Sequence, residues 1–155
     1  EPYLLSGHLD GIDTLGSENF IGDNKTTKKM IAAQYWKQYE PNVQIKGYDL
    51  AGSILYPDLG IKGVRIDAAQ TLVGGARFGA RVFYSSDTLR AEFLTDLEWW
   101  IRQAERFAQD DYWPMNMANC AICPFNGICS KEPDKREMYL NANFHKQFWN
   151  PLRER

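Results

Sequence analysis

The sequence of 155 residues predicts an α/β fold. Two pairs of segments have the composition and spacing of β-hairpins, and between and after them lie segments typical of helices. Hydrophobic residues make up 44% of the chain and aromatic residues 14%, which is enough to bury one core. The simplest organisation is therefore a single α/β domain.

The first hairpin is expected from residues 3–10 and 19–25. A polar loop joins them, and Leu15-Gly16-Ser17-Glu18 is the expected turn. An antiparallel pairing centred between Gly16 and Ser17 places Asp10 opposite Asp23. This register predicts that the two carboxylates lie on neighbouring strands at the same level of the sheet.

Four charged or ionisable residues of this hairpin are expected on one surface. Residues two apart on a strand point to the same side, so His8 and Asp10 share a face of the first strand. By the same spacing, Asp23 and Lys25 share a face of the second strand. An isolated D-x-K pair is most simply a solvated surface pair, and the remaining residues decide whether it carries chemistry.

Further elements follow along the chain. We expect a helical segment at 27–39, a helix at 43–56, a second hairpin from 62–72 and 77–84 with its turn at Gly74-Gly75, and a long helix capped by Ser86 or Asp87. Gly47 costs its helix roughly 1 kcal/mol relative to Ala, which indicates close packing at that position. The apolar stripe of the long helix has the spacing of a core face and comprises Leu89, Phe93, Leu97, Trp100, Ala104 and Phe107.

Composition excludes several classes of protein. No run of ~18 apolar residues occurs and no secretory signal opens the chain, so we expect no membrane partner. A net charge of −2 argues against a general polyanion binder but allows a local basic patch, since five lysines (Lys25, Lys28, Lys29, Lys37 and Lys46) cluster early in the sequence. Three closely spaced cysteines are no secreted disulfide framework, so the expected location is the reducing cytoplasm.

Two carboxylates beside a lysine suit the metal-assisted hydrolysis of phosphodiesters. Carboxylates suit the hard cations Mg²⁺ and Mn²⁺, which keep several water ligands and need few protein ligands. The metal lowers the pKa of a bound water and neutralises charge on the phosphate. A neighbouring lysine orients that water or stabilises the developing negative charge.

Three motifs in order resemble the PD-(D/E)XK nucleases, specifically their RecB-like branch. They are GHLDGID at 7–13, FIGDNKTT at 20–27 and QIKGYDLAG at 44–52. The branch has an acid after a strand, then D/E-x-K followed by Thr, then a helix with Q-x-x-x-Y. The matching residues are Asp10, then Asp23 and Lys25, then Gln44 and Tyr48. The resemblance covers about the first third of the chain and implies a restriction-endonuclease-like core, a small mixed sheet flanked by helices.

The resemblance also implies roles for these residues. Asp10, Asp23 and the backbone carbonyl of Asn24 would bind Mg²⁺ or Mn²⁺, Lys25 would be the catalytic cation, and Gln44 and Tyr48 would position the lysine or a DNA phosphate. Without the resemblance, the alternative explanation of Gln44 and Tyr48 is a half-buried helix seam. His8 either contacts the metal or DNA, or is a hydrogen-bonded strand histidine.

A second candidate metal site lies in NCAICPFNGICS at 119–130. Cys120, Cys123 and Cys129 have the pattern C-x₂-C-x₅-C in an irregular segment, which is not the spacing of core positions. The pattern resembles the C-terminal cysteines of iron–sulfur nucleases of the AddB and CRISPR-adaptation types and related phage exonucleases. A [4Fe–4S] cluster takes four thiolates, so the fourth ligand lies before Glu1, or the site binds Zn²⁺ with a ligand such as His145, or it is degenerate.

The expected function is metal-dependent hydrolysis of DNA, by an exonuclease acting on ends or single strands. The expected setting is recombination, repair, phage replication or CRISPR-type adaptation, with recombination or replication proteins as partners. Residues 1–112 would form the nuclease core and 113–155 its cysteine-rich C-terminal cap and tail. Because extended sequence begins at once, we expect this core to lack its N-terminal helix, which leaves the activity of this chain open. The alternative is a non-catalytic DNA-binding module that keeps the fold and a metal-stapled cap.

Overall fold

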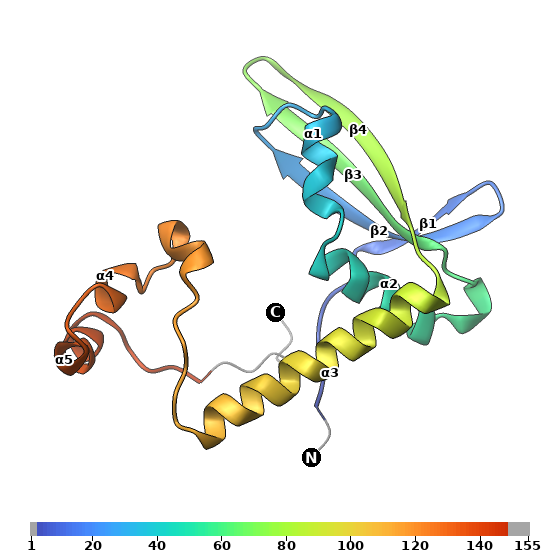
Figure 1. Cartoon of the computed structure of the whole chain (residues 1–155). Helices are drawn as coiled ribbons and strands as arrows, with labels where there is room; N and C mark the ends of the chain where they lie inside the picture. The colour runs from blue at the N-terminus through green and yellow to red at the C-terminus, as the bar shows by residue number, and fades with distance from the viewer. Residues whose placement is uncertain (1–2, 149–155) are drawn as a thin grey trace. The chain divides into compact units, whose positions relative to one another are not determined.

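The computed structural model describes residues 3–148 and contains a four-stranded mixed sheet flanked by helices (Figure 1). The predicted α/β class with a small mixed sheet is therefore confirmed. The chain divides into two compact units, Gly7–Arg102 and Gln103–Arg155, the latter together with Glu1–Ser6. The boundary falls within helix α3 (Asp87–Gln109) rather than after residue 112.

The sheet belongs to the first unit and has the strand order β1-β2-β3-β4. Strands β1 (Gly11–Leu15) and β2 (Glu18–Thr27) are antiparallel, as are β3 (Gly63–Leu72) and β4 (Gly75–Tyr84). The central pair, β2 and β3, is parallel. A parallel pair needs a crossover connection, and here helices supply it.

Both predicted hairpins form, but the first begins later than expected. Its turn uses Gly16 at a left-handed φ of 62°, a conformation that glycine adopts without steric cost. Gly11 pairs with Gly22, which is the predicted register. The prediction of a strand at 3–10 was wrong, because that segment has no β-pairing and the strand starts at Gly11.

Short helices connect β2 to β3. They are α1 (Ala33–Trp36), η1 (Lys37–Tyr39), α2 (Val43–Leu55) and η2 (Pro57–Leu59). The predicted helical segment at 27–39 is thus confirmed only in its second half, since β2 continues to Thr27. The predicted helix at 43–56 is confirmed, and Asn42 caps it by accepting hydrogen bonds from the backbone N–H groups of the next turn.

The crossover helices cover one face of the sheet. Ile21, Val64 and Ile66 are fully buried there, in one cluster with Trp36 of α1 and Ile45 of α2. This face of β2 also carries Asp23 and Lys25, because they lie two and four residues after Ile21 and alternate residues of a strand point to the same face. The core therefore holds the helices over the strand that bears the D-x-K motif.

Helix α2 lies close against the sheet at Gly52. A Cβ added there would lie 2.5 Å from Ile21 Cδ1, closer than atoms can pack. Gly47 has open space where its Cβ would be, so the prediction of close packing at Gly47 was wrong. The close contact lies more than one helical turn further along.

Helix α3 begins where predicted, and the Ser86 hydroxyl accepts a hydrogen bond from the Leu89 N–H at 3.3 Å. Its apolar stripe is only partly a core face. Phe93 is buried, but Trp100 is 63% exposed. Periodicity correctly indicated an amphipathic helix, but it does not show how far along the helix a partner extends.

The second unit contains short helices around the cysteine segment, η3 (Met117–Ile122), α4 (Asn126–Cys129) and α5 (Pro133–Asn143). The rings of Phe125 and Phe144 stack with their centroids 4.7 Å apart. The Tyr3 hydroxyl donates a hydrogen bond to Glu105 at 2.7 Å. In the described part of the chain, no helix is both long and apolar enough to cross a membrane.

Candidate nuclease site

The centre of the candidate site is an ion pair within strand β2. Lys25 Nζ donates a hydrogen bond to Asp23 Oδ1 at 2.9 Å and lies 2.8 Å from Oδ2. The Asp23 side chain is only 3% exposed, whereas that of Lys25 is 25% exposed. A carboxylate buried this deeply is not a solvated surface pair, because a buried charge needs a partner. The surface interpretation of the D-x-K motif is therefore excluded.

Asp10 lies beside this pair, as the predicted register requires. The continuation of the β1–β2 register places it next to Asp23, and its Oδ2 accepts a hydrogen bond from the Asn24 N–H at 3.0 Å. Asp10 immediately precedes β1 and is exposed. The structure thus brings together Asp10, Asp23, Asn24 and Lys25, four of the residues selected from the sequence.

The oxygen atoms of this site fit a hard divalent cation. Asp23 Oδ2 is buried, and among the described residues its close polar neighbour is the Lys25 ammonium at 2.8 Å, with no hydrogen bond formed to it. Asp10 supplies a second, accessible carboxylate on the adjoining chain segment. Within residues 3–148, no three side chains of His, Cys, Asp or Glu gather at one point. Mg²⁺ commonly takes one or two carboxylates and completes its shell with water, so two carboxylates and a backbone carbonyl suffice.

Gln44 and Tyr48 form a pair on α2, the helix that packs against β2 and β3. Gln44 Nε2 donates a hydrogen bond to the Tyr48 hydroxyl at 2.9 Å, which confirms that they share a helical face. Gln44 is exposed, and the ring of Tyr48 packs against the core cluster. Among the described residues, neither side chain hydrogen-bonds to Asp10, Asp23 or Lys25.

Substitution separates the two interpretations of this pair. Tyr48→Phe keeps the ring and Gln44→Ala removes an exposed amide, so each should cost less than ~1 kcal/mol of unfolding free energy. If the pair positions Lys25 or a phosphate, DNA cleavage should fall in both variants while the melting temperature stays within a few degrees. Turnover of labelled DNA and thermal melting measure the two effects. A loss of stability with unchanged turnover would mean that the pair is only a packing seam.

His8 is not brought into the site. Its side chain is exposed and makes no hydrogen bond or ion pair with any other residue of the described chain. The expectation that it shares a strand face with Asp10 depended on a strand at 3–10. Because that strand does not form, alternation no longer fixes the direction of His8, and its contact with a metal or DNA stays a prediction.

The sequence reasoning missed two tyrosines near the site. The hydroxyls of Tyr35 and Tyr39 lie 3.1 Å apart and share a hydrogen bond. Burial of Tyr39, its hydrogen bond with Tyr35 and the negative charge of Asp23 all raise the pKa of Tyr39. Tyr39 therefore stays protonated, and a hydroxyl donor, throughout the neutral range. The available signal was the spacing of four between the tyrosines, which places them on one helical face.

Asp13 lies on the opposite face of the sheet, as alternation from Asp10 predicts. Its Oδ2 is 3.9 Å from Arg65 Nε, and Arg65 also donates a hydrogen bond to Asp67 at 2.8 Å. A Cβ at Gly22 would lie 2.7 Å from the Asp13 carboxylate, so glycine allows the aspartate to cross the strand there. Asp13 is therefore part of a separate charge cluster.

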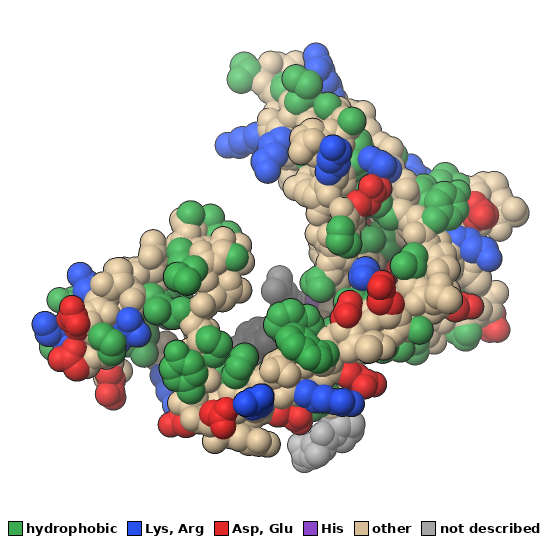
Figure 2. Space-filling model, viewed as in Figure 1, with side chains coloured by type: hydrophobic (Ala, Val, Ile, Leu, Met, Phe, Trp, Pro, Cys, Tyr) green, Lys and Arg blue, Asp and Glu red, His purple; other side chains and the backbone are tan. Residues whose placement is uncertain are grey.

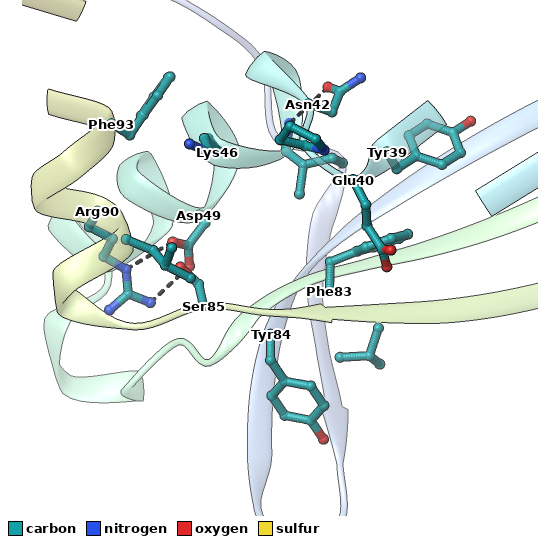
Figure 3. A pocket seen from close by; sticks show the side chains of 14 residues that line it. Tyr39, Glu40, Asn42, Lys46, Asp49, Phe83, Tyr84, Ser85, Arg90 and Phe93 are labelled. Atoms are coloured by element: carbon teal, nitrogen blue, oxygen red, sulfur yellow. Dashed lines mark hydrogen bonds and ion pairs between the residues drawn. The ribbon is translucent and has the colours of Figure 1, made fainter. Parts of the chain in front are cut away.

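A prominent hollow of the first unit is not the candidate site (Figure 3). It has a volume of about 640 Å³ and lies between α2, the end of β4 and the start of α3. Asp49 and Arg90 form an ion pair in its wall, and the hydrogen bond to Asp49 raises the pKa of Arg90. The hollow that borders Lys25 is smaller, about 410 Å³, and includes Asn24. The volume of a hollow therefore does not indicate where the Asp23–Lys25 ion pair of β2 lies.

The second candidate site, the cysteine trio, lies in the second unit. Cys120, Cys123 and Cys129 are free and half-buried. Within residues 3–148, these cysteines and His145 do not form a group of three side chains placed to hold a metal ion. Thiolate sites form as metal binds, since binding and folding are coupled, so the cofactor stays a prediction.

Purification under different atmospheres tests the cofactor. Protein prepared without oxygen should be brown and contain iron if thiolates hold an iron–sulfur cluster. Colourless protein with one zinc per chain would support the zinc alternative. In either case Cys123→Ser should lower the melting temperature, because metal binding contributes folding free energy. If both preparations contain neither iron nor zinc, the cysteine trio is not a metal site.

Comparisons with known proteins do not assign a family, since no protein-family model and no curated protein matches the chain. The resemblance to nucleases therefore rests on the order of the three motifs. The chemistry of the side chains around Asp23 is what points to a function.

Proposed function

We propose that the protein is a Mg²⁺- or Mn²⁺-dependent deoxyribonuclease of the PD-(D/E)XK type, an exonuclease acting on DNA ends or single strands. The observation that carries the proposal is the arrangement around Asp23. The buried carboxylate of Asp23 lies beside a second acid, Asp10, and both of its oxygens lie within 2.9 Å of the ammonium of Lys25, two residues along the same strand.

Each residue has a distinct part in this proposal. Asp10, Asp23 and the carbonyl of Asn24 hold the divalent cation. When bound, the cation supplies an acidified water and a positive charge at the phosphate. Lys25 orients the attacking water through hydrogen bonding, or neutralises charge on the phosphoryl oxygens in the transition state. Its partial exposure leaves the ammonium accessible to a substrate.

Residues outside this centre complete the proposal. Gln44 and Tyr48 hold a phosphate or the lysine, and the cysteine trio holds a [4Fe–4S] cluster or Zn²⁺ that stabilises the second unit. The protein acts in the cytoplasm in recombination, repair, phage replication or CRISPR-type adaptation, with recombination or replication proteins as partners.

A cleavage assay with matched DNA forms tests the function. The full-length protein is incubated with end-labelled linear DNA and with circular DNA, each single- and double-stranded, in Mg²⁺, Mn²⁺ or EDTA. Degradation of linear forms only, and only with a divalent cation, is the expected result. Cleavage of circles would make the enzyme an endonuclease. DNA binding without cleavage in any cation would favour the non-catalytic module, and neither binding nor cleavage would overturn both functions.

A further inference from the structure

The charges of the first unit are segregated along the sequence. Residues 24–39 contain four lysines and no acid, and residues 68–86 contain two arginines and no acid. The chain as a whole has a net charge of −2. The two acid-free segments include the last four residues of β2, the second half of β3, the helix α1 and all of β4. Positive charge is therefore concentrated toward one end of the sheet.

The fold brings four of these cations to one surface. Thr27 of β2 pairs with Gln70 of β3, which pairs with Arg77 of β4. Two lysines follow Thr27 directly, and the second of them lines a hollow of about 470 Å³ together with the lysine that begins η1. We call this surface the basic patch; it consists of Lys28, Lys29, Lys37 and Arg77, all of them exposed. Figure 2 shows Lys and Arg side chains gathered at this end of the first unit, over α1 and the strand ends.

The basic patch lacks acidic partners among the described residues. In the described part of the chain none of its four side chains forms an ion pair, whereas the neighbouring cations are paired. Lys25 pairs with Asp23, and Arg81 Nη2 lies 3.0 Å from Glu40. Like charges gathered on one surface repel each other, and an anion with several charges relieves that repulsion. The surface therefore favours a ligand with a row of negative charges.

Strand β2 sets the distance from the candidate site to the basic patch. The strand runs from Asp23 through Lys25 to Thr27, and Lys28 follows. At about 3.3 Å per residue, Lys28 lies roughly 16 Å along the strand from Asp23. Phosphates of one B-form strand are about 3.4 Å apart along the helix axis, so this distance corresponds to about five nucleotides.

From this geometry we infer that the basic patch binds phosphates of the DNA strand several nucleotides from the scissile bond. This inference rests on the proposed function, because it takes the site at Asp23 as the place of cleavage. The patch holds the strand in register while Asp23 and Lys25 act on one phosphodiester. It touches no reacting atom and is a positioning surface.

Salt dependence of binding is the direct test. We compare the protein with K28Q/K29Q/K37Q/R77Q in EDTA, using a labelled strand of about 20 nucleotides, long enough to span both sites. Each lost phosphate contact should reduce the slope of log K against log[salt] by about 0.7 for single strands, or about three in total. Affinity at low salt should fall at least about tenfold. An unchanged slope and an unchanged affinity would overturn the proposal that the basic patch binds DNA phosphates.

The matched control is Lys62→Gln. Lys62 is exposed in the same unit but precedes β3, at the end of the sheet remote from the patch. For Lys62→Gln, the slope of log K against log[salt] should equal that of the unaltered protein. Arg77→Gln alone should reduce this slope. An equal decrease in both variants would show that only net charge matters and would overturn the patch.

Cleavage kinetics separate the two proposals. The quadruple variant should show a raised KM on long strands and an unchanged turnover on fragments of about three nucleotides, which cannot reach the patch. Suppose that the unaltered protein cleaves DNA and that the variants bind DNA as tightly as it does. The proposal that the basic patch binds DNA would then be wrong, and the proposed nuclease function would be kept. If binding shows the expected slopes but no cation supports cleavage, the patch stands and the nuclease assignment fails.

Discussion

Lys25→Met should reduce DNA cleavage by about 10²-fold or more while metal and DNA still bind. That is the usual scale for removing one preorganised contact to the transition state. Methionine keeps the aliphatic stem of the side chain and removes only the ammonium. The measurement is single-turnover cleavage of labelled DNA in Mg²⁺, expressed per folded molecule, beside a metal titration of the same preparation.

Asp23→Asn should behave differently, because it removes a proposed metal ligand. Metal binding and cleavage should fall together, and excess Mn²⁺ should restore part of a weakened site. The amide has nearly the shape of the carboxylate, so the buried position remains filled. Titration calorimetry with Mn²⁺ and the cleavage assay, on the same protein, show whether the two losses coincide.

The competing explanation is a purely structural ion pair. Breaking a buried pair destabilises a protein whether or not it is catalytic, so both variants are also unfolded with urea. Lys62→Met is the matched control, an exposed lysine of the same unit, and should change neither quantity. Full activity per folded molecule in Lys25→Met would show that the pair only stabilises the sheet, and the nuclease assignment of this site would be wrong.

Local chemistry made the site predictable. The turn at Gly16 fixes the register of β1 and β2, and alternation along β2 then fixes which side chains face the helices. Both rules act over a few residues and can be applied to a sequence alone. They placed Asp10, Asp23 and Lys25 together, although they did not show that Asp23 would be buried.

Errors arose where structure depends on a distant partner. Residues 3–10 have an extended composition, but a strand needs a neighbouring chain to pair with, and Leu4 and Leu5 remain exposed. The stripe on α3 has a core periodicity, yet only Phe93 of its residues is buried. The hydrogen bonds between Arg90 and Asp49 join residues 41 positions apart, and no local pattern indicates such a pair.

Arg90→Met should lower the unfolding free energy by about 3–5 kcal/mol, the usual cost of removing one partner from a buried ion pair. Arg90 donates to both carboxylate oxygens of Asp49, at 2.8 and 2.9 Å, and to the Ile61 carbonyl at 2.7 Å. Asp49 is only 3% exposed, so the substitution leaves a buried charge without a partner. Urea unfolding measures the loss.

A double variant distinguishes the buried charge from the lost packing. Asp49→Leu combined with Arg90→Met replaces the pair by apolar side chains and should recover most of the stability that Arg90→Met loses, because no charge then remains buried. Asp87→Ala is the exposed control, since the Asp87 side chain of the adjacent ion pair is 98% exposed. That change should stay within about 1 kcal/mol, the range of surface ion pairs. If Arg90→Met lowers the unfolding free energy by less than about 1 kcal/mol, Arg90 is not the essential partner of the buried Asp49 charge. Water or another cation would then compensate that charge in solution.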